Sequence, residues 1–129
     1  MTHWEKYGLE EKIRKILADV SPSFPGHHLG RPFLTTYQIA IKLDEAYPSI
    51  AKELGYQVGG KGIGRHVSLA QYIGGQLSQR IAPGREGRIV DIEGAFLSRE
   101  SMKEMLFTGG IVSSTEGQDL SMYRLTSRP

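Results

Sequence analysis

Apolar residues in the first part of the chain recur every three or four positions, the spacing of helices that bury one face. The first such stretch predicts a helix over residues 2–20, whose inward face carries Leu9, Ile13, Ile16, Leu17 and Val20. Thr2 and Glu5 have the spacing of a capping box at its start, whereas Gly8 weakens its first turns. We expect an amphipathic N-terminal helix that packs against the rest of the chain.

A second apolar stripe lies in residues 36–54 and consists of Ala40, Leu43, Tyr47, Ile50 and Leu54. Pro48 interrupts this stretch because it cannot donate a hydrogen bond inside a helix, although it suits the first turn of a new one. The pattern therefore predicts a helix to about Ala46, a bend, and a short helix from Pro48 to Leu54. Gly55 follows as a left-handed cap.

Glycine and proline separate the helices. Residues 21–35 and the glycine-rich residues 56–67 are expected to be loops. Residues 68–81 form the next predicted helix, with Ser68 as its N-cap. A step of 100° per residue places Leu69, Ala70, Ile73, Leu77 and Ile81 on a buried face. The same wheel places opposite them a polar face without acidic residues, comprising Ser68, Gln71, Gly75, Ser78 and Gln79, with Tyr72 at the edge.

Beyond residue 88 the pattern changes to the alternation that is typical of strands. Residues 88–97 predict a strand with Val90, Ile92 and Phe96 on one face and a bulge or bend at Gly94. Ser98 would cap a short helix over residues 99–107, followed by short strands at 111–113 and 120–126. We expect one α+β domain over residues 1–129, with a small helical core and a short antiparallel sheet or wing near the C-terminus.

The order of these elements suggests a family. A helix pair, a capped helix and then a two- or three-stranded sheet, across residues 36–126, resembles the winged helix-turn-helix architecture. The resemblance implies that residues 68–81 are a recognition helix that enters a DNA groove. The chain departs from the family in its linker, since residues 56–67 exceed the usual three- to four-residue turn. It also departs in the helix expected at 99–107, which would separate the two strands of the wing.

The distribution of charge agrees with an anionic partner. The net charge is only +2, and the charges of residues 1–60 cancel. Residues 61–88, however, carry Lys61, Arg65, Arg80, Arg85 and Arg88 against Glu86 alone. A basic surface attracts nucleic acid, phosphate or an acidic protein, although a solvated basic face would show the same excess.

Together these signals select candidate contacts to double-stranded DNA. Lys61 and Arg65 would hold phosphates near the start of the helix, where free N–H groups favour anions. Glutamine can pair with an adenine edge and serine with several bases, whereas arginine, the usual reader of guanine, is missing from the outer face. The predicted nucleic-acid-binding residues are Lys61, Arg65, His66, Ser68, Gln71, Tyr72 and Gln79.

Three other motifs are incomplete, so we expect neither an enzyme nor a cofactor. Gly55, Gly60 and Lys61 have P-loop spacing, but Gly62 replaces the Ser or Thr that holds magnesium, and a helix precedes the loop. His27 and His28 lack a third ligand at metal-binding spacing. His66 and Ser68 would need Asp91 or Glu93 nearby to form a catalytic site, and serine at a helix start is usually a cap.

The absence of cysteine and of long apolar runs bears on where the protein is found, and its tyrosines suggest an alternative function. The chain has no cysteine, which excludes disulfides and thiolate metal sites, and it has no apolar run of membrane-spanning length. We expect a cytoplasmic protein without membrane association. The alternative to DNA binding is a protein–protein interaction or homodimerisation domain. Tyrosines suit an interface, and the chain has Tyr37, Tyr47, Tyr56, Tyr72 and Tyr123. Tyr47 faces the core by its phase, whereas Tyr56 and Tyr72 flank the basic loop and would stack on bases or lie at a subunit contact; the glycine-rich loop would provide further contacts.

Overall fold

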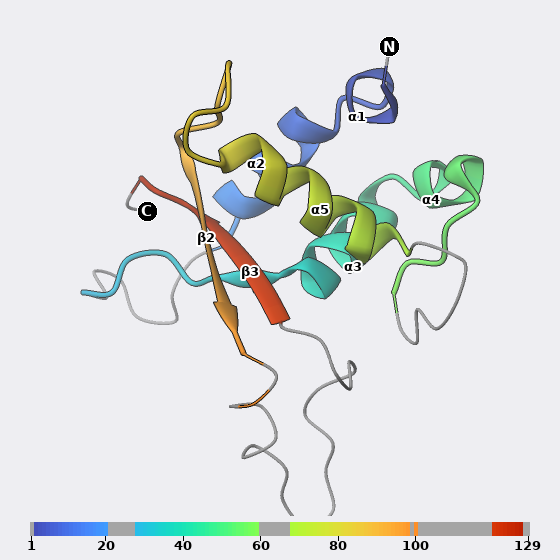
Figure 1. The fold of residues 1–129 in the computed structure, drawn as a ribbon. Helices are drawn as coiled ribbons and strands as arrows, with labels where there is room; N and C mark the ends of the chain where they lie inside the picture. The colour runs from blue at the N-terminus through green and yellow to red at the C-terminus, as the bar shows by residue number, and fades with distance from the viewer. Residues whose placement is uncertain (1, 21–27, 60–67, 99, 101–119, 128–129) are drawn as a thin grey trace, which may run out of the picture.

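The computed structural model describes residues 2–20, 28–59, 68–98, 100 and 120–127. Its helices are α1 (His3–Lys6), α2 (Leu9–Ala18), α3 (Thr36–Ala46), α4 (Ser49–Leu54) and α5 (Leu69–Ile81). Its strands are β1 (Leu34–Thr35), β2 (Ile92–Leu97) and β3 (Leu120–Leu125). They form one antiparallel sheet in the order β1-β3-β2, against which α2, α3 and α5 pack (Figure 1). The expected α+β class, with a short antiparallel sheet near the C-terminus, is confirmed.

The N-terminal segment is two helices rather than the single helix predicted for residues 2–20. The break lies at Gly8, which adopts a left-handed conformation (φ 59°) that only glycine reaches without strain. The Thr2 hydroxyl caps α1 by accepting a hydrogen bond from the Glu5 amide at 3.2 Å, which is one of the two hydrogen bonds of the predicted capping box. The turn brings Trp4 back onto the core, where it is 2% exposed.

The two helices on either side of Pro48 agree with their prediction. The Thr35 hydroxyl and the Gln38 side chain form a reciprocal capping box at the start of α3. Gly55 (φ 74°) ends α4, and the Tyr56 amide donates to the Ala51 carbonyl at 3.0 Å in a Schellman motif. Gly55 therefore serves as a helix cap, and a helix rather than a strand precedes the glycine-rich loop.

The expected loop over residues 21–35 is wrong at its end, because Leu34 and Thr35 form strand β1. Leu34 pairs with Tyr123 and Thr35 with Met122 of β3. The loop prediction failed because so short a strand has no alternating pattern of its own, and its partner lies at the other end of the chain. The predicted strand over residues 120–126 is confirmed as β3.

Strand β2 starts later than predicted and buries only part of its expected apolar face. Ile92 is 3% exposed, but Val90 and Phe96 are 70% and 62% exposed. The expected bulge at Gly94 is also wrong, because the register runs without interruption from Ile92 opposite Leu125 to Leu97 opposite Leu120. Instead, the bare backbone at Gly94 accommodates the Tyr123 ring, since a methyl group there would lie 2.7 Å from Tyr123 Cε1. The helix expected at 99–107 and the strand at 111–113 fall outside the described residues, apart from Glu100.

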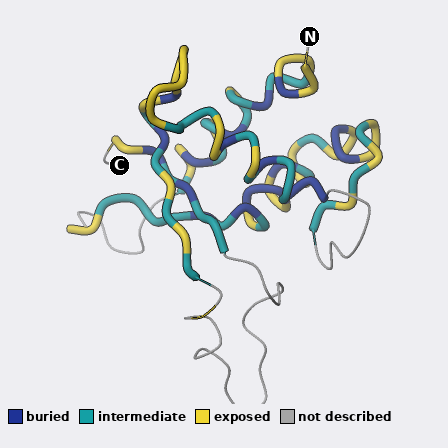
Figure 2. The backbone as a smooth tube through the Cα atoms, viewed as in Figure 1, coloured by how far each residue is buried: buried dark blue, intermediate teal, exposed yellow. Residues whose placement is uncertain are grey.

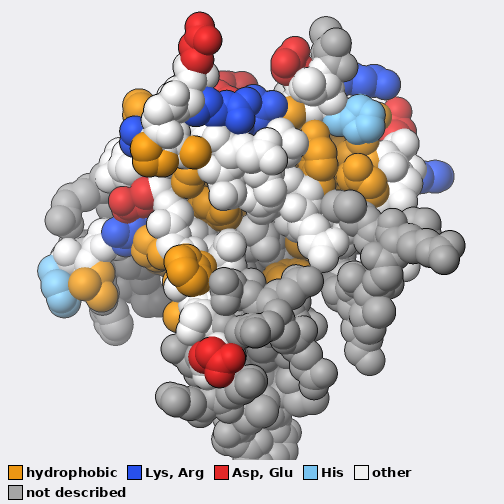
Figure 3. Space-filling view, in the orientation of Figure 1, with side chains coloured by type: hydrophobic (Ala, Val, Ile, Leu, Met, Phe, Trp, Pro, Cys, Tyr) orange, Lys and Arg blue, Asp and Glu red, His pale blue; other side chains and the backbone are white. Residues whose placement is uncertain are grey.

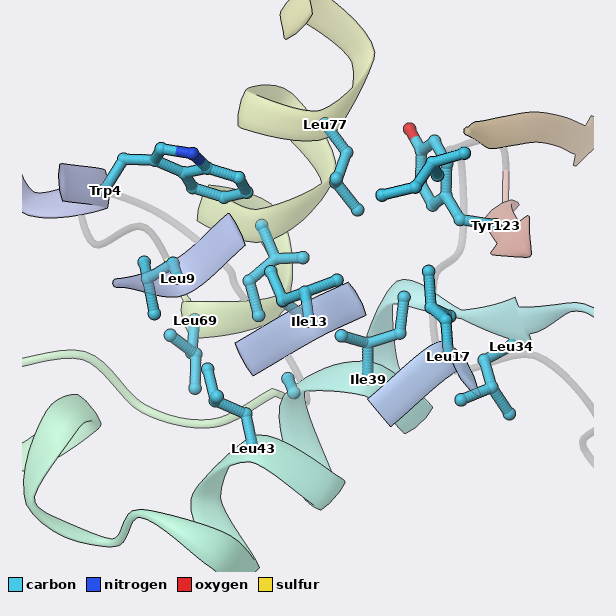
Figure 4. Close-up of a cluster of buried hydrophobic side chains, with 14 of the residues drawn as sticks. Trp4, Leu9, Ile13, Leu17, Leu34, Ile39, Leu43, Leu69, Leu77 and Tyr123 are labelled. Carbon is cyan, nitrogen blue, oxygen red and sulfur yellow. The ribbon is translucent and has the colours of Figure 1, made fainter. Parts of the chain in front are cut away.

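One hydrophobic core joins the helices and the sheet (Figure 2). The close-up shows side chains of α2 lying between α5 and α3, with Trp4 at one end and Tyr123 at the other (Figure 4). Its largest fully buried side chains are Leu9, Ile13, Leu17, Ile39, Leu43, Leu69, Ile73 and Leu77. Each of these belongs to a helix, and the inner face of α5 provides three of them. Helix α5 is therefore held rigidly by its inner face.

Candidate nucleic-acid interface

The predicted division of α5 into two faces holds for most of its length. Leu69, Ala70, Ile73 and Leu77 are each at most 1% exposed, whereas Ile81 is half-buried at the rim of the core. On the opposite side, Gly75, Ser78 and Gln79 are exposed. Figure 3 shows the surface in front of α5 mainly in white, the colour of backbone and of side chains that are neither charged nor hydrophobic, bordered by a band of Lys and Arg side chains, and the helix contains no acidic residue. The outer face of α5, meaning Gly75, Ser78 and Gln79, is thus accessible to a partner.

Ser68 does not belong to this outer face, contrary to the expectation. It is 4% exposed, and its hydroxyl accepts a hydrogen bond from the Gln71 amide at 3.1 Å. In return, Gln71 Oε1 accepts from the Ser68 amide, also at 3.1 Å. An N-cap residue has extended backbone, here φ −80° and ψ 164°, so a helical wheel does not predict where its side chain points. The capping box therefore occupies Ser68 and the side-chain oxygen of Gln71, which is half-buried.

The start of α5 is also less open to an anion than expected. The Leu69 amide donates to the Gln57 carbonyl at 2.7 Å, and the Ala70 amide donates to the Val58 carbonyl at 3.1 Å. Since the Gln71 amide is taken by Ser68, the first three N–H groups of the helix all have partners within the protein. The prediction that free N–H groups would favour a phosphate here is wrong. The cause is the start of the linker, which folds back onto the helix.

Tyr72 and Arg80 flank the outer face, and both side chains contact other residues of the protein. The rings of Tyr72 and Tyr56 lie 5.8 Å apart at 45°. Burial raises the pKa of the Tyr72 hydroxyl, and the neighbouring Tyr56 raises it further, so this group stays protonated at neutral pH. The Arg80 guanidinium lies 4.8 Å from the Trp4 ring centre, and its Nε donates to Gln76 at 3.1 Å. Tyr72 is thus the edge residue that the wheel predicted, only half-exposed.

The predicted basic residues are divided between described and undescribed parts of the chain. Lys61, Arg65 and His66 lie outside the described residues. Arg85 and Arg88 are exposed in the turns that follow α5. This segment is attached to the end of the helix, because the Ile89 amide donates to the Arg80 carbonyl at 2.9 Å. Exposed positive charge therefore adjoins the C-terminal end of α5.

Asp91 and Glu93, the carboxylates that a catalytic site with His66 and Ser68 would need, each form an ion pair with an arginine. Asp91 accepts two hydrogen bonds from the Arg14 guanidinium, at 2.8 and 3.0 Å, and these hold the pKa of its carboxyl below the usual value. Glu93 accepts from Arg124 Nε at 2.6 Å. Both carboxylates thus take part in ion pairs that fasten α2 and the sheet, while Ser68 caps α5.

Among the described residues, no group of three or more His, Asp or Glu side chains could hold a metal ion. None of the described helices is long and apolar enough to cross a membrane.

Tyr123, which the sequence grouped with the tyrosines that could line a protein interface, is instead a buried link between the sheet and α5. Tyr123 is 4% exposed, and its hydroxyl donates to the Gly74 carbonyl in the middle of α5 at 3.3 Å. Its ring covers Gly94 of β2. Tyr123 therefore sets how the β2–β3 pair lies against α5. Residues two apart in a strand lie on the same face, so its spacing from the apolar Leu125 was the only local indication that the Tyr123 side chain faces the core.

Comparisons with protein-family models, with curated proteins and with solved structures found no significant match to this chain.

Proposed function

We propose that this protein is a non-enzymatic, winged-helix-like module that binds double-stranded DNA. The outer face of α5 enters a groove, and Lys61, Arg65 and His66 of the preceding loop contact the phosphates. The order of the described elements supports this reading. A helix pair is followed by a capped helix and then by the two longer strands of a three-stranded antiparallel sheet.

The observation that carries the proposal is a rigid helix with an exposed, acid-free polar face. The inner face of α5 is anchored by four buried residues, so the helix presents Ser78 and Gln79 from a fixed frame; the four are Leu69, Ala70, Ile73 and Leu77. A preorganised surface loses little conformational entropy on binding. Glutamine can pair with the N6 and N7 atoms of adenine, and serine can hydrogen-bond to several bases.

The structure of the helix start changes how the phosphates would be bound. The first three amides of α5 and the Ser68 hydroxyl already have partners. Contacts to the DNA phosphates at this end of the helix would therefore come from basic side chains rather than from these amides. Lys61 and Arg65 precede the helix, while Arg85 and Arg88 are exposed beyond its end. Basic residues therefore precede and follow the polar face along the chain, and basic side chains are among the groups that make positioning contacts to DNA phosphates.

A salt titration of binding to random-sequence duplex tests the proposal. We expect a dissociation constant below millimolar at low salt, with log K falling linearly with log salt concentration as counterions are released. The double variant Lys61→Glu/Arg65→Glu should weaken binding and lower the slope by about 0.9 for each lost phosphate contact. Lys52→Glu, an exposed charge change on α4, is the matched control and should have a smaller effect. Millimolar or weaker affinity, or no response to salt, would refute DNA binding.

A second candidate function, homodimerisation or docking of another protein, rests on β2. This strand is at the edge of the sheet and, among the described strands, pairs only with β3. Val90 and Phe96, near its two ends, are exposed apolar side chains. Open strand edges with apolar neighbours favour pairing with another chain. Sedimentation equilibrium tests this: a dimer that Phe96→Ser dissociates supports the candidate, and a monomer at all concentrations refutes the homodimer.

A further inference from the structure

Helix α5 contains two adjacent glycines, and the structure explains only the first. A methyl group at Gly74 would lie 3.1 Å from Thr36 Cγ2, so this glycine permits the close crossing of α3 and α5. Its carbonyl also accepts the Tyr123 hydroxyl. Internal packing thus accounts for Gly74.

Gly75 has no such explanation. It is exposed, it lies in a regular helical turn, and its φ is not positive. Among the described residues, and leaving aside the helix's own backbone, a methyl group at this position would have no heavy atom within 4 Å. Glycine is the least favourable residue in a helix interior after proline, so any ordinary side chain would make α5 more stable. The packing of the described residues therefore gives no reason for glycine here.

The side chains around Gly75 indicate what could use the bare backbone. Positions three and four residues away on a helix are its surface neighbours, and here they are Gln71, Tyr72, Ser78 and Gln79. All four carry hydrogen-bonding groups without formal charge at neutral pH, and none is aliphatic. A protein partner would gain most from aromatic or arginine anchors, and Tyr72, half-exposed with its ring against Tyr56, is the single aromatic residue among these four. The edges of base pairs present donors and acceptors in fixed pairs and suit such a surface better.

We propose that Gly75 is the point of closest approach between α5 and the base edges in the DNA major groove, which lets Ser78 and Gln79 read the neighbouring bases. This inference rests on the DNA-binding function proposed above. It adds that binding is sequence-selective, with an A·T pair favoured where Gln79 contacts the groove. A side chain at position 75 would hold the helix away from the base edges, and it would leave side-chain contacts to the phosphates in place.

The test compares the full chain with two variants after selection of duplexes from a random pool. Gly75→Ala should melt at a higher temperature than the wild type because the helix is favoured. It should nevertheless bind the selected duplex about tenfold or more weakly, and a scrambled duplex within about twofold of the wild type. Gly75→Asn, a larger and poorer helix former than alanine, should show the same loss of selectivity. Ser49→Ala on α4 is the control and should change neither affinity.

The outcomes separate the inference from the function on which it rests. If the wild type selects no duplex and binds none, DNA binding itself fails, and the inference fails with it. If the wild type binds DNA but Gly75→Ala retains full affinity and selectivity, only the role of Gly75 is overturned. If Gly75→Ala weakens both duplexes equally, position 75 acts on general affinity and the base-reading role is likewise overturned.

Discussion

Replacing Ser68 by alanine should destabilise the fold, although the sequence pattern placed this residue among the DNA contacts. The hydroxyl is 4% exposed and accepts the Gln71 amide at 3.1 Å. Alanine leaves that amide at the start of α5 without its partner. It also breaks one half of a reciprocal capping box whose other half runs from the Ser68 amide to Gln71 Oε1.

The magnitude follows from the cap and from its burial. Losing a serine N-cap typically costs about 1 kcal/mol of protein stability, with a range up to about 2 kcal/mol. The site is buried, so water replaces the lost hydroxyl poorly, and we expect a loss of about 1.5 kcal/mol in the free energy of unfolding. An unfolding entropy of about 2.1 cal/mol/K per residue, over 129 residues, converts this loss to a Tm lower by about 6 °C.

Urea titration and thermal melting of three variants provide the assay. Ser68→Ala should lose about 1.5 kcal/mol, and Ser68→Asp should recover most of it because a carboxylate can accept the same amide. Ser78→Ala, on the outer face of the same helix, should change stability by less than about 0.5 kcal/mol. If Ser68→Ala is as stable as Ser78→Ala, Ser68 does not cap α5 and the corrected assignment of the site is wrong.

Three further substitutions probe the framework that holds α5. Gly94→Ala should lower the free energy of unfolding by about 1–2 kcal/mol in urea denaturation, because the added methyl group would lie 2.7 Å from the Tyr123 ring. This cost exceeds the small gain from the better strand propensity of alanine, and unchanged stability would contradict the packing of Tyr123 on Gly94. Arg14 lowers the pKa of Asp91, so their pair stabilises the fold above the unfolded pKa of about 3.9 and loses this effect as pH falls through the lower folded pKa. Both side chains are partly exposed, so Asp91→Asn should cost about 0.5 kcal/mol at pH 7 and progressively less as pH falls through the lowered folded pKa, and a cost that does not change with pH would refute the linkage. Ile13→Ala, at a side chain with no exposure, should cost about 2–5 kcal/mol by calorimetry, and a loss below about 1 kcal/mol would contradict its central place in the core.

Much of the helical part of the fold could be predicted from the sequence because its signals are local. The break at Pro48, the cap at Gly55 and the start of α5 after Ser68 depend on residues within one turn of each other. The apolar repeat within each helix likewise identified the side that is buried. The same local rule found the exposed face of Gly75, Ser78 and Gln79, which remains the centre of the candidate site.

Pairings between distant segments were decided only by the tertiary structure. Strand β1 exists because Leu34 meets Tyr123, and Asp91 is an ion-pair partner because α2 brings Arg14 beside it. The fold also closed the start of α5 with the Gln57 and Val58 carbonyls, which removed an expected phosphate site.

The two adjacent glycines of α5 show the difference most directly. The helical wheel placed Gly75 on the outer face, where it is exposed, but no local pattern indicated that Gly74 would lie against Thr36 of α3. Helix periodicity is set by backbone geometry within a few residues, so the sequence alone determined the helices and most of their buried faces. Which atoms fill the space beside a residue depends on segments far away along the chain, and only the packed structure decided that.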